Sequence, residues 1–488
     1  MHNNGGAMSN TKSFPYEYLI VAALCAISFG PIAFCLSCAG IFYTPVATDI
    51  GSSPATMSYF ITMVTIPMVL VLAPLGKLFD KMDCRIIMTA SVGLIAVCFL
   101  LLSFINAAWQ FLALAFVIGF GLTSCVYLAP PVLINRWFSK RAGFFVGLVM
   151  AFTGVGGVVW APVGSILITS IGWRATYLVF AALTAGIGLP FTIFVLRNRP
   201  SDVGRQPYGF APAAVTEMKG NIAGAASVAT SQALVTENGA AAGYSAAVDA
   251  ENAATLSELG ASGEAATLSE LGTSAATPAS ESYESYESQG IPAQEAYKMP
   301  SFFLLAGFAL FFPLAVYIYG MIPSYVATLQ VSDTMPLLGA VASSCAMATS
   351  IAAKMLWGAL GEKNLVLSVA ASAGLAVVGI LVLWFVPGPW LIICIAAAAY
   401  GMVYGEQTVF CPIATRRFFG MRSYSELYSK ISIIICIGVI AGTFGGGTIL
   451  NVTGSYPIMF TYIICMLVLS VLFIVLGERA RRRAETRR

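Results

Sequence analysis

Two charged side chains stand inside long apolar stretches and give the sequence its most specific chemical signal. Lys354 lies in the apolar run 336–360, and Glu406 lies in the run 389–414. Charges within a membrane are costly, so each such residue usually serves a substrate, an ion or a partner charge. An ammonium can bind an anion, and a buried carboxylate can accept a proton. The alternatives are a structural ion pair between the two and, for Lys354, a side chain that extends to the nearby cytoplasmic surface.

The sequence offers few residues for other kinds of chemistry. His2, in a polar tail, is the single histidine of the chain, which excludes a histidine base and a histidine-built metal site. Nearly all of the 11 cysteines lie in apolar runs, where thiols are usually inert. The glycine-rich run 442–447 lacks the lysine of a phosphate-binding loop. We therefore expect no enzyme, no cofactor and no bound metal.

The elements that must hold Lys354 and Glu406 are membrane helices. Apolar residues make up 58% of the chain and charged residues 10%, whereas soluble domains carry about 25% charged residues. The apolar residues gather in continuous runs long enough to cross a bilayer as helices, and they do not alternate as they would in a barrel. We expect an all-α membrane protein with twelve transmembrane helices, over residues 17–42, 54–76, 86–105, 109–135, 142–170, 174–196, 300–327, 336–360, 364–386, 389–414, 426–450 and 456–476.

The basic residues predict the orientation of these helices. Of the 25 lysines and arginines, Arg174 alone falls in a loop on one side, and nearly all the others lie on the opposite side. Because positive loops stay cytoplasmic, we place both termini in the cytoplasm, which requires an even number of spans. We interpret the first span as a retained helix rather than a removed signal peptide. The small net charge of +3 argues against nucleic-acid binding and leaves the lipid bilayer as the expected surrounding.

A hydrophilic segment divides the chain into two halves. Between residues 206 and 297 there is one basic residue against eleven acids, in a context rich in Ala, Ser, Gly and Thr. Such a composition predicts disorder, most simply in a tether between the halves, with a docking role as the alternative. We expect a cytoplasmic tail over 1–16, a six-helix bundle over 17–196, a disordered acidic linker over 197–299, a second six-helix bundle over 300–476 and a basic cytoplasmic tail over 477–488.

The two halves also resemble each other. When the chain is shifted along itself so that Gly76 meets Gly358, Asp80 meets Glu362, and further glycines, prolines and tyrosines match across five helices. One constant shift over that length indicates two homologous six-helix bundles. Transporters built from such repeats bind their substrate near the membrane midplane, between the halves.

These features resemble the major facilitator superfamily. The segment from 76 to 85 is similar to the superfamily's cytoplasmic loop motif between helices 2 and 3, although Asp83 stands where the family usually has glycine. Three further stretches resemble the oxalate/formate antiporter and monocarboxylate porter group: residues 136–147, the glycine-rich fifth helix with its ending at 172–174, and residues 197–209. The resemblance implies a set of residues whose contacts hold one conformation: Gly76, Asp80, Lys81, Arg85, Arg136 and Arg141.

The same resemblance implies roles for residues of the predicted site. In the family a cation on helix 8, usually arginine, binds the substrate carboxylate, and Lys354 occupies the corresponding place. Tyr127 and Tyr404 match positions whose aromatic side chains line the cavity, and Tyr43 is a further candidate; for each, packing in a helix interface is the alternative. Lys430 follows a Leu-Tyr-Ser segment like one in the family, displaced by one residue, and it either faces the cavity or extends to the cytoplasmic surface.

We therefore expect a monomeric secondary transporter of the cell membrane that moves a small organic anion, a mono- or dicarboxylate, by alternating access. Its energy source would be a proton, in symport, or an exchanged anion, in antiport, because the sequence contains no ATP-binding motif. The alternatives are an exporter of larger amphipathic compounds, in which Lys354 and Glu406 form a structural pair, and a substrate sensor on a transporter fold.

Overall fold

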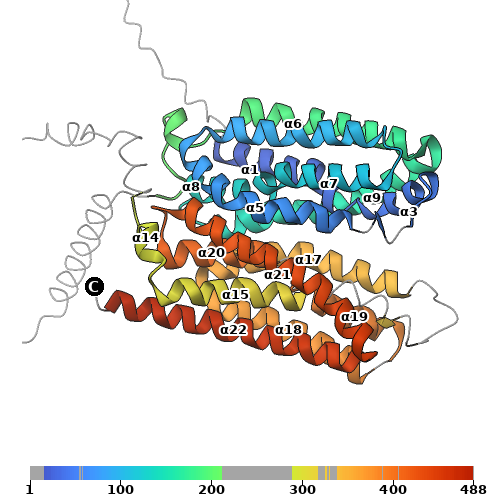
Figure 1. Ribbon diagram of the computed structural model, residues 1–488. Helices are drawn as coiled ribbons and strands as arrows, with labels where there is room; N and C mark the ends of the chain where they lie inside the picture. The colour runs from blue at the N-terminus through green and yellow to red at the C-terminus, as the bar shows by residue number, and fades with distance from the viewer. Residues whose placement is uncertain are drawn as a thin grey trace, which may run out of the picture.

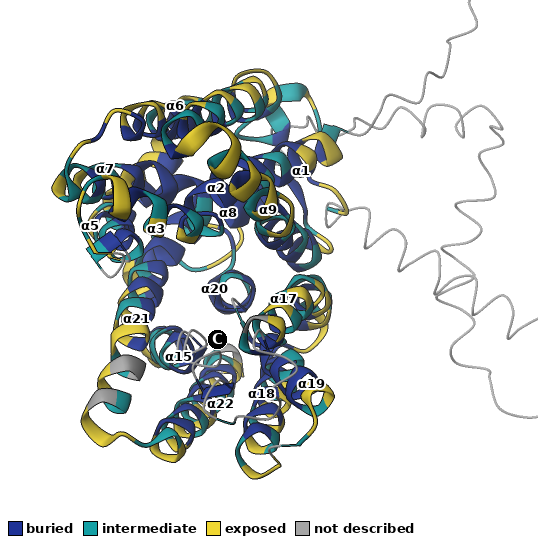
Figure 2. Ribbon diagram, turned by 90° about the vertical axis from the view of Figure 1, so that its right-hand side faces the viewer, coloured by how far each residue is buried: buried dark blue, intermediate teal, exposed yellow. Residues whose placement is uncertain are grey.

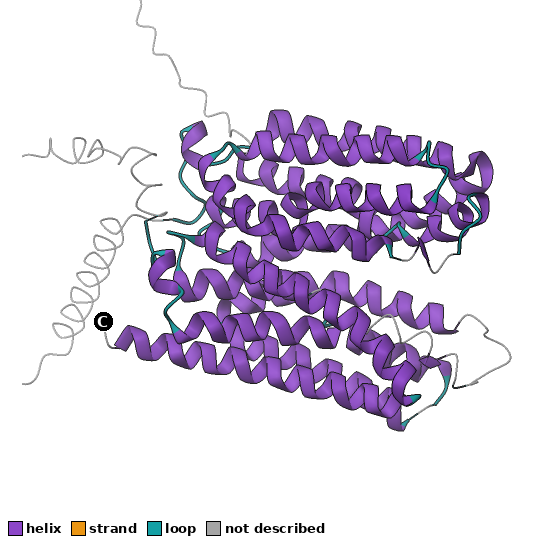
Figure 3. Ribbon diagram, viewed as in Figure 1, coloured by secondary structure: helices purple, strands orange, loops and turns teal. Residues whose placement is uncertain are grey.

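The protein is built from helices. The computed structural model describes residues 16–53, 56–57, 59–210, 288–316, 325–326, 329, 338–386, 388–404 and 406–486. Within these ranges the chain forms helices joined by turns and short loops, and its β-structure is limited to two isolated bridges (Figure 3). The predicted all-α class is confirmed.

The first half of the chain forms one bundle, coloured blue to green in Figure 1. Aromatic rings fill its core: the rings of Phe42 and Tyr177 stack with centroids 4.0 Å apart, and those of Phe34 and Phe180 with centroids 4.4 Å apart. Its helices are α1 (Tyr16–Ile27), η1 (Ser28–Ile32), α2 (Ala33–Leu36), α3 (Gly40–Asp49), α5 (Phe60–Lys81), α6 (Cys84–Leu102), α7 (Ala108–Leu122), η2 (Thr123–Leu128), α8 (Ala129–Trp137), α9 (Ala142–Leu183), η3 (Thr184–Gly188), η4 (Phe191–Val195) and η5 (Pro200–Val203).

The second half forms the other bundle, coloured yellow to red in Figure 1. Its helices are α14 (Ala293–Ala296), α15 (Pro300–Val316), α17 (Leu338–Lys363), α18 (Leu365–Phe385), α19 (Trp390–Gly401), α20 (Gln407–Phe419), α21 (Tyr424–Thr453) and α22 (Tyr456–Thr486). The shift that brings Gly76 onto Gly358 also brings α5 onto α17, α6 onto α18 and the first part of α9 onto α21. The duplication predicted from scattered residue matches thus reappears in the order and length of the helices.

Two equivalent helix pairs join the bundles, α5 with α21 and α9 with α17, and Figure 2 shows the bundles facing each other along this interface. Glycines allow the close approach. A Cβ added to Gly76 would lie 2.4 Å from Ser429 Oγ, and one added to Gly358 would lie 2.3 Å from the carbonyl oxygen of Gly143. We call the end of the molecule where these contacts occur the basic end, because the loops around Arg136 and Arg416 lie there.

Helix boundaries differ from the prediction at three places. The predicted span 389–414 is two helices, α19 and α20, and the described residues between them, 402–404 and 406, form turns. The spans 142–170 and 174–196 are nearly continuous, and Gly172, with φ of 82°, makes the break between them. Helix α22 extends to Thr486, so most of the predicted basic tail is helical; there Glu478 pairs with arginines three and four residues later, which supports a helix end.

Both ends of the predicted linker 197–299 are folded against the basic end. The backbone amide of Tyr208 donates to the carbonyl of Trp137 over 2.8 Å, and the amide of Ile291 donates to the carbonyl of Phe419 over 2.8 Å. Isolated bridges join Phe138 with Tyr208 and Gly290 with Gly420. Residues 211–287, most of the predicted linker, lie outside the described residues.

The outer faces of the bundles are apolar. Eight helical stretches of the described chain are long and apolar enough to cross a membrane, and the stretch 142–195 is long enough to do so twice. Large apolar side chains such as Leu70, Ile86, Leu367 and Ile395 are more than half exposed. Such a surface is compatible with lipid rather than water around the molecule, as a transmembrane bundle requires.

Candidate functional site

A cavity of about 860 Å³ lies between the two bundles. Its floor is set by α9 and α17, which touch at the basic end and diverge beyond Gly154. A Cβ added to Gly147 would lie only 2.1 Å from the carbonyl oxygen of Lys354, so these helices are in backbone contact just below the cavity. The lining comes from both halves: Ile32, Leu36, Ser37, Val126, Tyr127, Met150, Thr153, Gly154, Gly157, Val158, Ala161, Pro162, Ser343, Ser344, Met347, Ala348, Lys354, Tyr404 and Thr408.

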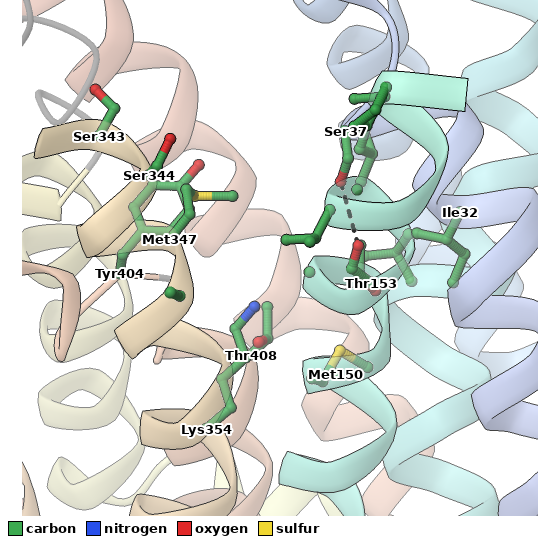
Figure 4. A pocket seen from close by; sticks show the side chains of 18 of the residues that line it. Ile32, Ser37, Met150, Thr153, Ser343, Ser344, Met347, Lys354, Tyr404 and Thr408 are labelled. Carbon is green, nitrogen blue, oxygen red and sulfur yellow. Dashed lines mark hydrogen bonds between the residues drawn. The ribbon is translucent and has the colours of Figure 1, made fainter. Parts of the chain in front are cut away.

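Lys354 supplies the charge of this cavity. Its side chain points into the cavity beside Thr408, as Figure 4 shows. Among the described residues that line the cavity, Lys354 is the one with a charged side chain. It lies nine residues before the end of α17, about 14 Å along the helix axis. That distance is more than a lysine side chain spans, and the geometry does not favour the alternative in which Lys354 extends to the surface.

Glu406 lies behind the cavity wall, at the start of α20. It is completely buried, and neither carboxylate oxygen has a hydrogen-bond partner in the described part of the chain. Lys354 is the charged neighbour that interacts electrostatically with its carboxylate, although no direct ion pair between the two is present among the described residues. An ionised carboxylate is costly to bury without hydrogen bonds. The two charges are therefore close enough to interact, but they lack the direct contact of a structural salt bridge.

The break between α19 and α20 places Tyr404 in the cavity wall and Glu406 behind it. The carbonyl freed at Met402 accepts a hydrogen bond of 3.0 Å from Trp357 Nε1 on α17. Thr349 Oγ1, also on α17, donates to the carbonyl of Ala398 over 2.8 Å. Helix α17 thus supports an irregular backbone that a membrane would otherwise not tolerate. Discontinuous helices of this kind are typical of the binding sites of secondary transporters.

The structure brings only some of the other predicted site residues to the cavity. Tyr127 and Tyr404 line it. Tyr43 lies on α3 outside the lining, with its ring centroid 6.5 Å from that of Phe60. Lys430 is also outside: its Nζ lies 3.9 Å from the centre of the Tyr297 ring. Tyr43 and Lys430 therefore take part in packing rather than in the cavity.

The serine and threonine hydroxyls of the cavity lining were not predicted. Ser37 Oγ donates to the carbonyl of Thr153 over 3.3 Å within the first bundle (Figure 4). On the facing wall α17 contributes Ser343 and Ser344, and α20 contributes Thr408. Serine and threonine are common in membrane helices, where they bond to the backbone or to other helices. Their identity alone therefore carries no signal that would separate a site residue from a packing residue.

The predicted conformational motif is assembled at the basic end of the first bundle. Arg136, whose side chain is 4% exposed, donates to Asp80 Oδ1 over 2.8 Å and also to the side chain of Asn198. Asp80 in turn interacts with Ser425 at the start of α21. Arg85 pairs with Asp83, which caps α6, and stays within its own loop. Lys81 is exposed and has no partner among the described residues.

Equivalent contacts close the basic end from the second bundle. Glu362, the counterpart of Asp80, accepts a hydrogen bond of 2.7 Å from the backbone amide of Gly143, the counterpart of Ser425. Arg141 precedes that amide with a left-handed φ of 61°. Burial raises the pKa of Glu362, and the Gly143 amide and the charge of Arg416 oppose the rise. Each half thus holds the other through one acidic side chain.

Arg416 on α20 makes three hydrogen bonds across the interface. Its guanidinium donates to Asn135 Oδ1 over 2.9 Å, to the carbonyl of Phe138 over 3.2 Å and to that of Ser139 over 2.7 Å. In the sequence, Arg416 indicated only the orientation of the helices, and Glu362 matched Asp80 without an assigned role. The duplication was the signal that could have assigned Glu362, whereas nothing in the sequence indicates the carbonyl partners of Arg416.

Comparison with known proteins places this geometry in a family. The family model described as Major Facilitator Superfamily matches residues 23–412. The chain is 24% identical over 186 residues to the MFS-type transporter pynF of Aspergillus niger, covering 38% of this chain and 42% of that protein. It is 25% identical over 153 residues to monocarboxylate transporter 12 of Rattus norvegicus, covering 31% of each. The chain therefore matches less than half the length of either relative.

Solved structures share the arrangement of the helices. A crystal structure of the MFS transporter FucP in the outward conformation superposes with a TM-score of 0.57 at 13% identity, covering 95% of this chain and 99% of that one. A variant of the E. coli fucose:proton symporter FucP superposes with a TM-score of 0.55 at 13% identity and equal coverage. At this identity the likeness extends to the fold alone.

Proposed function

This chain belongs to the Major Facilitator Superfamily, and from that premise we propose that it carries a small organic anion across the cell membrane. Family and fold make it a multi-pass membrane transporter, not an enzyme, that works by alternating access. The substrate class is our proposal. Its main support is the ammonium of Lys354 in a cavity to which the described residues contribute no other charge.

We propose a monocarboxylate in preference to a dicarboxylate. One ammonium neutralises one carboxylate, and a second carboxylate would enter an apolar cavity without a counter-ion. The hydroxyls of Ser37, Ser343 and Thr408 can bind a carboxylate or a substrate hydroxyl, and Met150 and Met347 offer apolar walls to the rest of the molecule. The relative named monocarboxylate transporter 12 is compatible with this class.

Glu406 supports coupling to a proton. While its carboxylate is ionised, it competes with the substrate for the charge of Lys354. When the carboxylate takes up a proton, that charge becomes available to the anion, so one proton and one anion would bind together. The released anion and proton would restore the interaction of Glu406 with Lys354. Anion exchange is the variant of this scheme in which Glu406 keeps its protonation state.

The distribution of charge supports an orientation for the transporter. The loops of the basic end carry Arg136, Arg141 and Arg416, whereas Arg174 lies at the other end, where it pairs with Asp49. Positive loops face the cytoplasm. In this orientation both termini are cytoplasmic and the closed end faces inward, so the cavity lies on the outer side of the closure.

Substitution of Lys354 tests the proposal. Lys354→Gln should weaken binding of a carboxylate substrate by about 2–5 kcal/mol, which is at least about 30-fold, because the anion enters without its counter-ion. Lys354→Arg should retain part of the affinity, since it keeps the charge. Lys430→Gln removes the same charge from a lysine outside the cavity and is the matched control. Binding to labelled monocarboxylates, measured in one membrane preparation, should leave the control unchanged; near-normal affinity in Lys354→Gln would overturn the anion site.

A further inference from the structure

A second charged cavity lies at the basic end, on the outer side of the second bundle. It has a volume of about 270 Å³ and forms where the last turns of α22 meet the start of α18 and the end of α20. It does not belong to the substrate cavity, with which it shares no lining residue. Its described lining consists of Asn364, Val366, Arg417, Val475, Glu478, Arg479 and Arg482.

The charges around this cavity do not balance. Glu478 is buried and accepts from Arg417 over 3.2 Å, from Arg481 over 2.9 Å and from Arg482 over 3.2 Å. Burial raises the pKa of Glu478, but the hydrogen bonds from Arg481 and Arg417 outweigh this effect and lower the pKa to about 2. A single carboxylate thus faces three arginines. Arg479, which also lines the cavity, is exposed and has no partner in the described part of the chain.

Two further features indicate what this excess positive charge can bind. Helix α18 begins at the cavity, where Asn364 caps it and Val366 forms part of the wall, so the positive end of a 21-residue helix adds to the arginines. The rim of the cavity continues into the apolar outer face of the bundle. Leu367 on α18 is 65% exposed, and Leu472 and Leu476 on α22 are 49% and 37% exposed.

We propose that this cavity binds the phosphate headgroup of an anionic phospholipid. Guanidinium groups and a helix N-terminus are suited to a phosphate, and basic pockets between membrane helices bind such headgroups. The exposed leucines place apolar surface where the acyl chains of the lipid lie. A soluble phosphate would use the arginines alone, so the adjoining apolar face favours a lipid as the ligand. A bound lipid would hold the end of α22 against the start of α18.

Phosphatidylglycerol is the probe for this site. The full chain, purified in detergent, is titrated with phosphatidylglycerol, with phosphatidylcholine of the same acyl chains and with glycerol 3-phosphate, and bound lipid is counted by native mass spectrometry. Arg479→Gln with Arg482→Gln should lower the affinity for phosphatidylglycerol about 30-fold, roughly five-fold for each cation. Lys77→Gln with Lys298→Gln removes two exposed charges outside the cavity and should leave the affinity unchanged.

The outcomes separate the possible ligands. Preferential binding of phosphatidylglycerol that the arginine variant loses and the lysine control keeps would support the site. Equal binding of phosphatidylcholine, or equal affinity in the arginine variant, would overturn it. Competition by glycerol 3-phosphate at the concentrations at which the lipid binds would show a site for free phosphate and would overturn the lipid. If the double variant does not fold, Arg479→Gln alone, which breaks no ion pair among the described residues, should lower the affinity for phosphatidylglycerol about five-fold.

Discussion

At the scale of single residues, Glu406 has the least satisfied environment in the site. It is fully buried behind the cavity, its two oxygens accept no hydrogen bond from described residues, and Lys354 interacts with it without direct contact. A group in this state gains from any event that neutralises it or brings a partner closer. Binding of a proton and approach of the lysine are the two such events that the cavity allows.

Removal of this charge tests the proposed coupling. Glu406→Gln has the shape of the protonated acid and cannot release a proton. We expect the variant to exchange labelled for unlabelled substrate across proteoliposome membranes at near-normal rates, and to lose accumulation driven by an inward proton gradient. Wild-type uptake should rise as the outer pH falls, and uptake by the variant should not respond. Retained proton-driven accumulation in Glu406→Gln would contradict a proton-carrying role.

A double substitution distinguishes a functional pair from a structural one. If Lys354 and Glu406 only neutralise each other, Lys354→Gln with Glu406→Gln should restore transport that each single change reduces, because no uncompensated charge remains. If Lys354 binds the anion, the double variant should remain about as defective in substrate binding as Lys354→Gln. Substrate affinity for the four proteins, compared at equal expression, decides between these results.

The sequence indicated the two charged residues of the candidate site but not its serine and threonine hydroxyls. Lys354 and Glu406 could be found because a charge in an apolar run is costly and therefore informative. Ser37, Ser343 and Thr408 could not be found, because a hydroxyl in a membrane helix costs little. Whether Lys430 faces the cavity depends on which side of α21 it occupies. In the structure it lies against the ring of Tyr297. That ring is distant in the sequence, so the residues around Lys430 give no signal of the contact.

At the scale of helices, the basic end is closed by two acidic side chains that each reach the first turn of a helix in the other half. Asp80 on α5 interacts with Ser425, and Glu362 on α17 accepts from the amide of Gly143. Because these positions are equivalent in the two halves, each bundle contributes one acidic side chain to the closure. Opening toward the basic end must break both contacts and the three hydrogen bonds of Arg416.

Two substitutions of Glu362 should shift the equilibrium between the closed and the open basic end in opposite directions. Burial raises the pKa of Glu362 in the closed state, so that state binds the proton more tightly and acidification favours it. The shift toward the closed state should occur as the pH falls through the range just above the ordinary glutamate pKa of about 4.3. Glu362→Gln keeps an acceptor for Gly143 without the charge and should also favour closure. Glu362→Ala leaves the amide without an acceptor and should favour opening by about 1 kcal/mol.

Distances between spin labels at Lys77→Cys and Lys298→Cys, one on each half at the basic end, measure this shift. Cys345 and Cys465 are replaced by serine, since the other nine cysteines are buried. A longer label distance in Glu362→Gln than in Glu362→Ala would contradict the assignment.

The sequence paired Glu362 with Asp80 through the duplication. It gave no boundary for the break between α19 and α20, because α17 supports that break through Trp357 and Thr349, which lie far from it in the chain.

At the scale of the whole molecule, two bundles related by duplication are joined at the basic end by side chains, and each bundle also binds one end of the linker there. The duplication was predictable because one constant shift in residue number relates loops and helices alike. The folded ends of the linker were not, since their contacts are mainly backbone hydrogen bonds that any residue can make. The amides of Met421 and Arg422, for example, both donate to the carbonyl of Gln289, over 2.7 Å and 3.1 Å.

The linker and its anchored end should therefore differ in their tolerance of change. Replacement of residues 211–287 by a flexible Gly-Ser segment of about half the length should leave transport within a few-fold of wild type, because the acidic composition of this segment gives it little apolar surface to bury. Gly420→Ala should reduce transport more, although it changes one residue. Gly420 has φ of +78°, and a Cβ there would lie 2.6 Å from the carbonyl oxygen of Gln289, so the contact with the second half must open. Uptake is compared at equal membrane expression, with Gly374→Ala, where an added Cβ meets nothing within 4 Å, as the control for glycine replacement. Loss of uptake after linker replacement, with the bundles still inserted, would show that residues 211–287 act directly in transport.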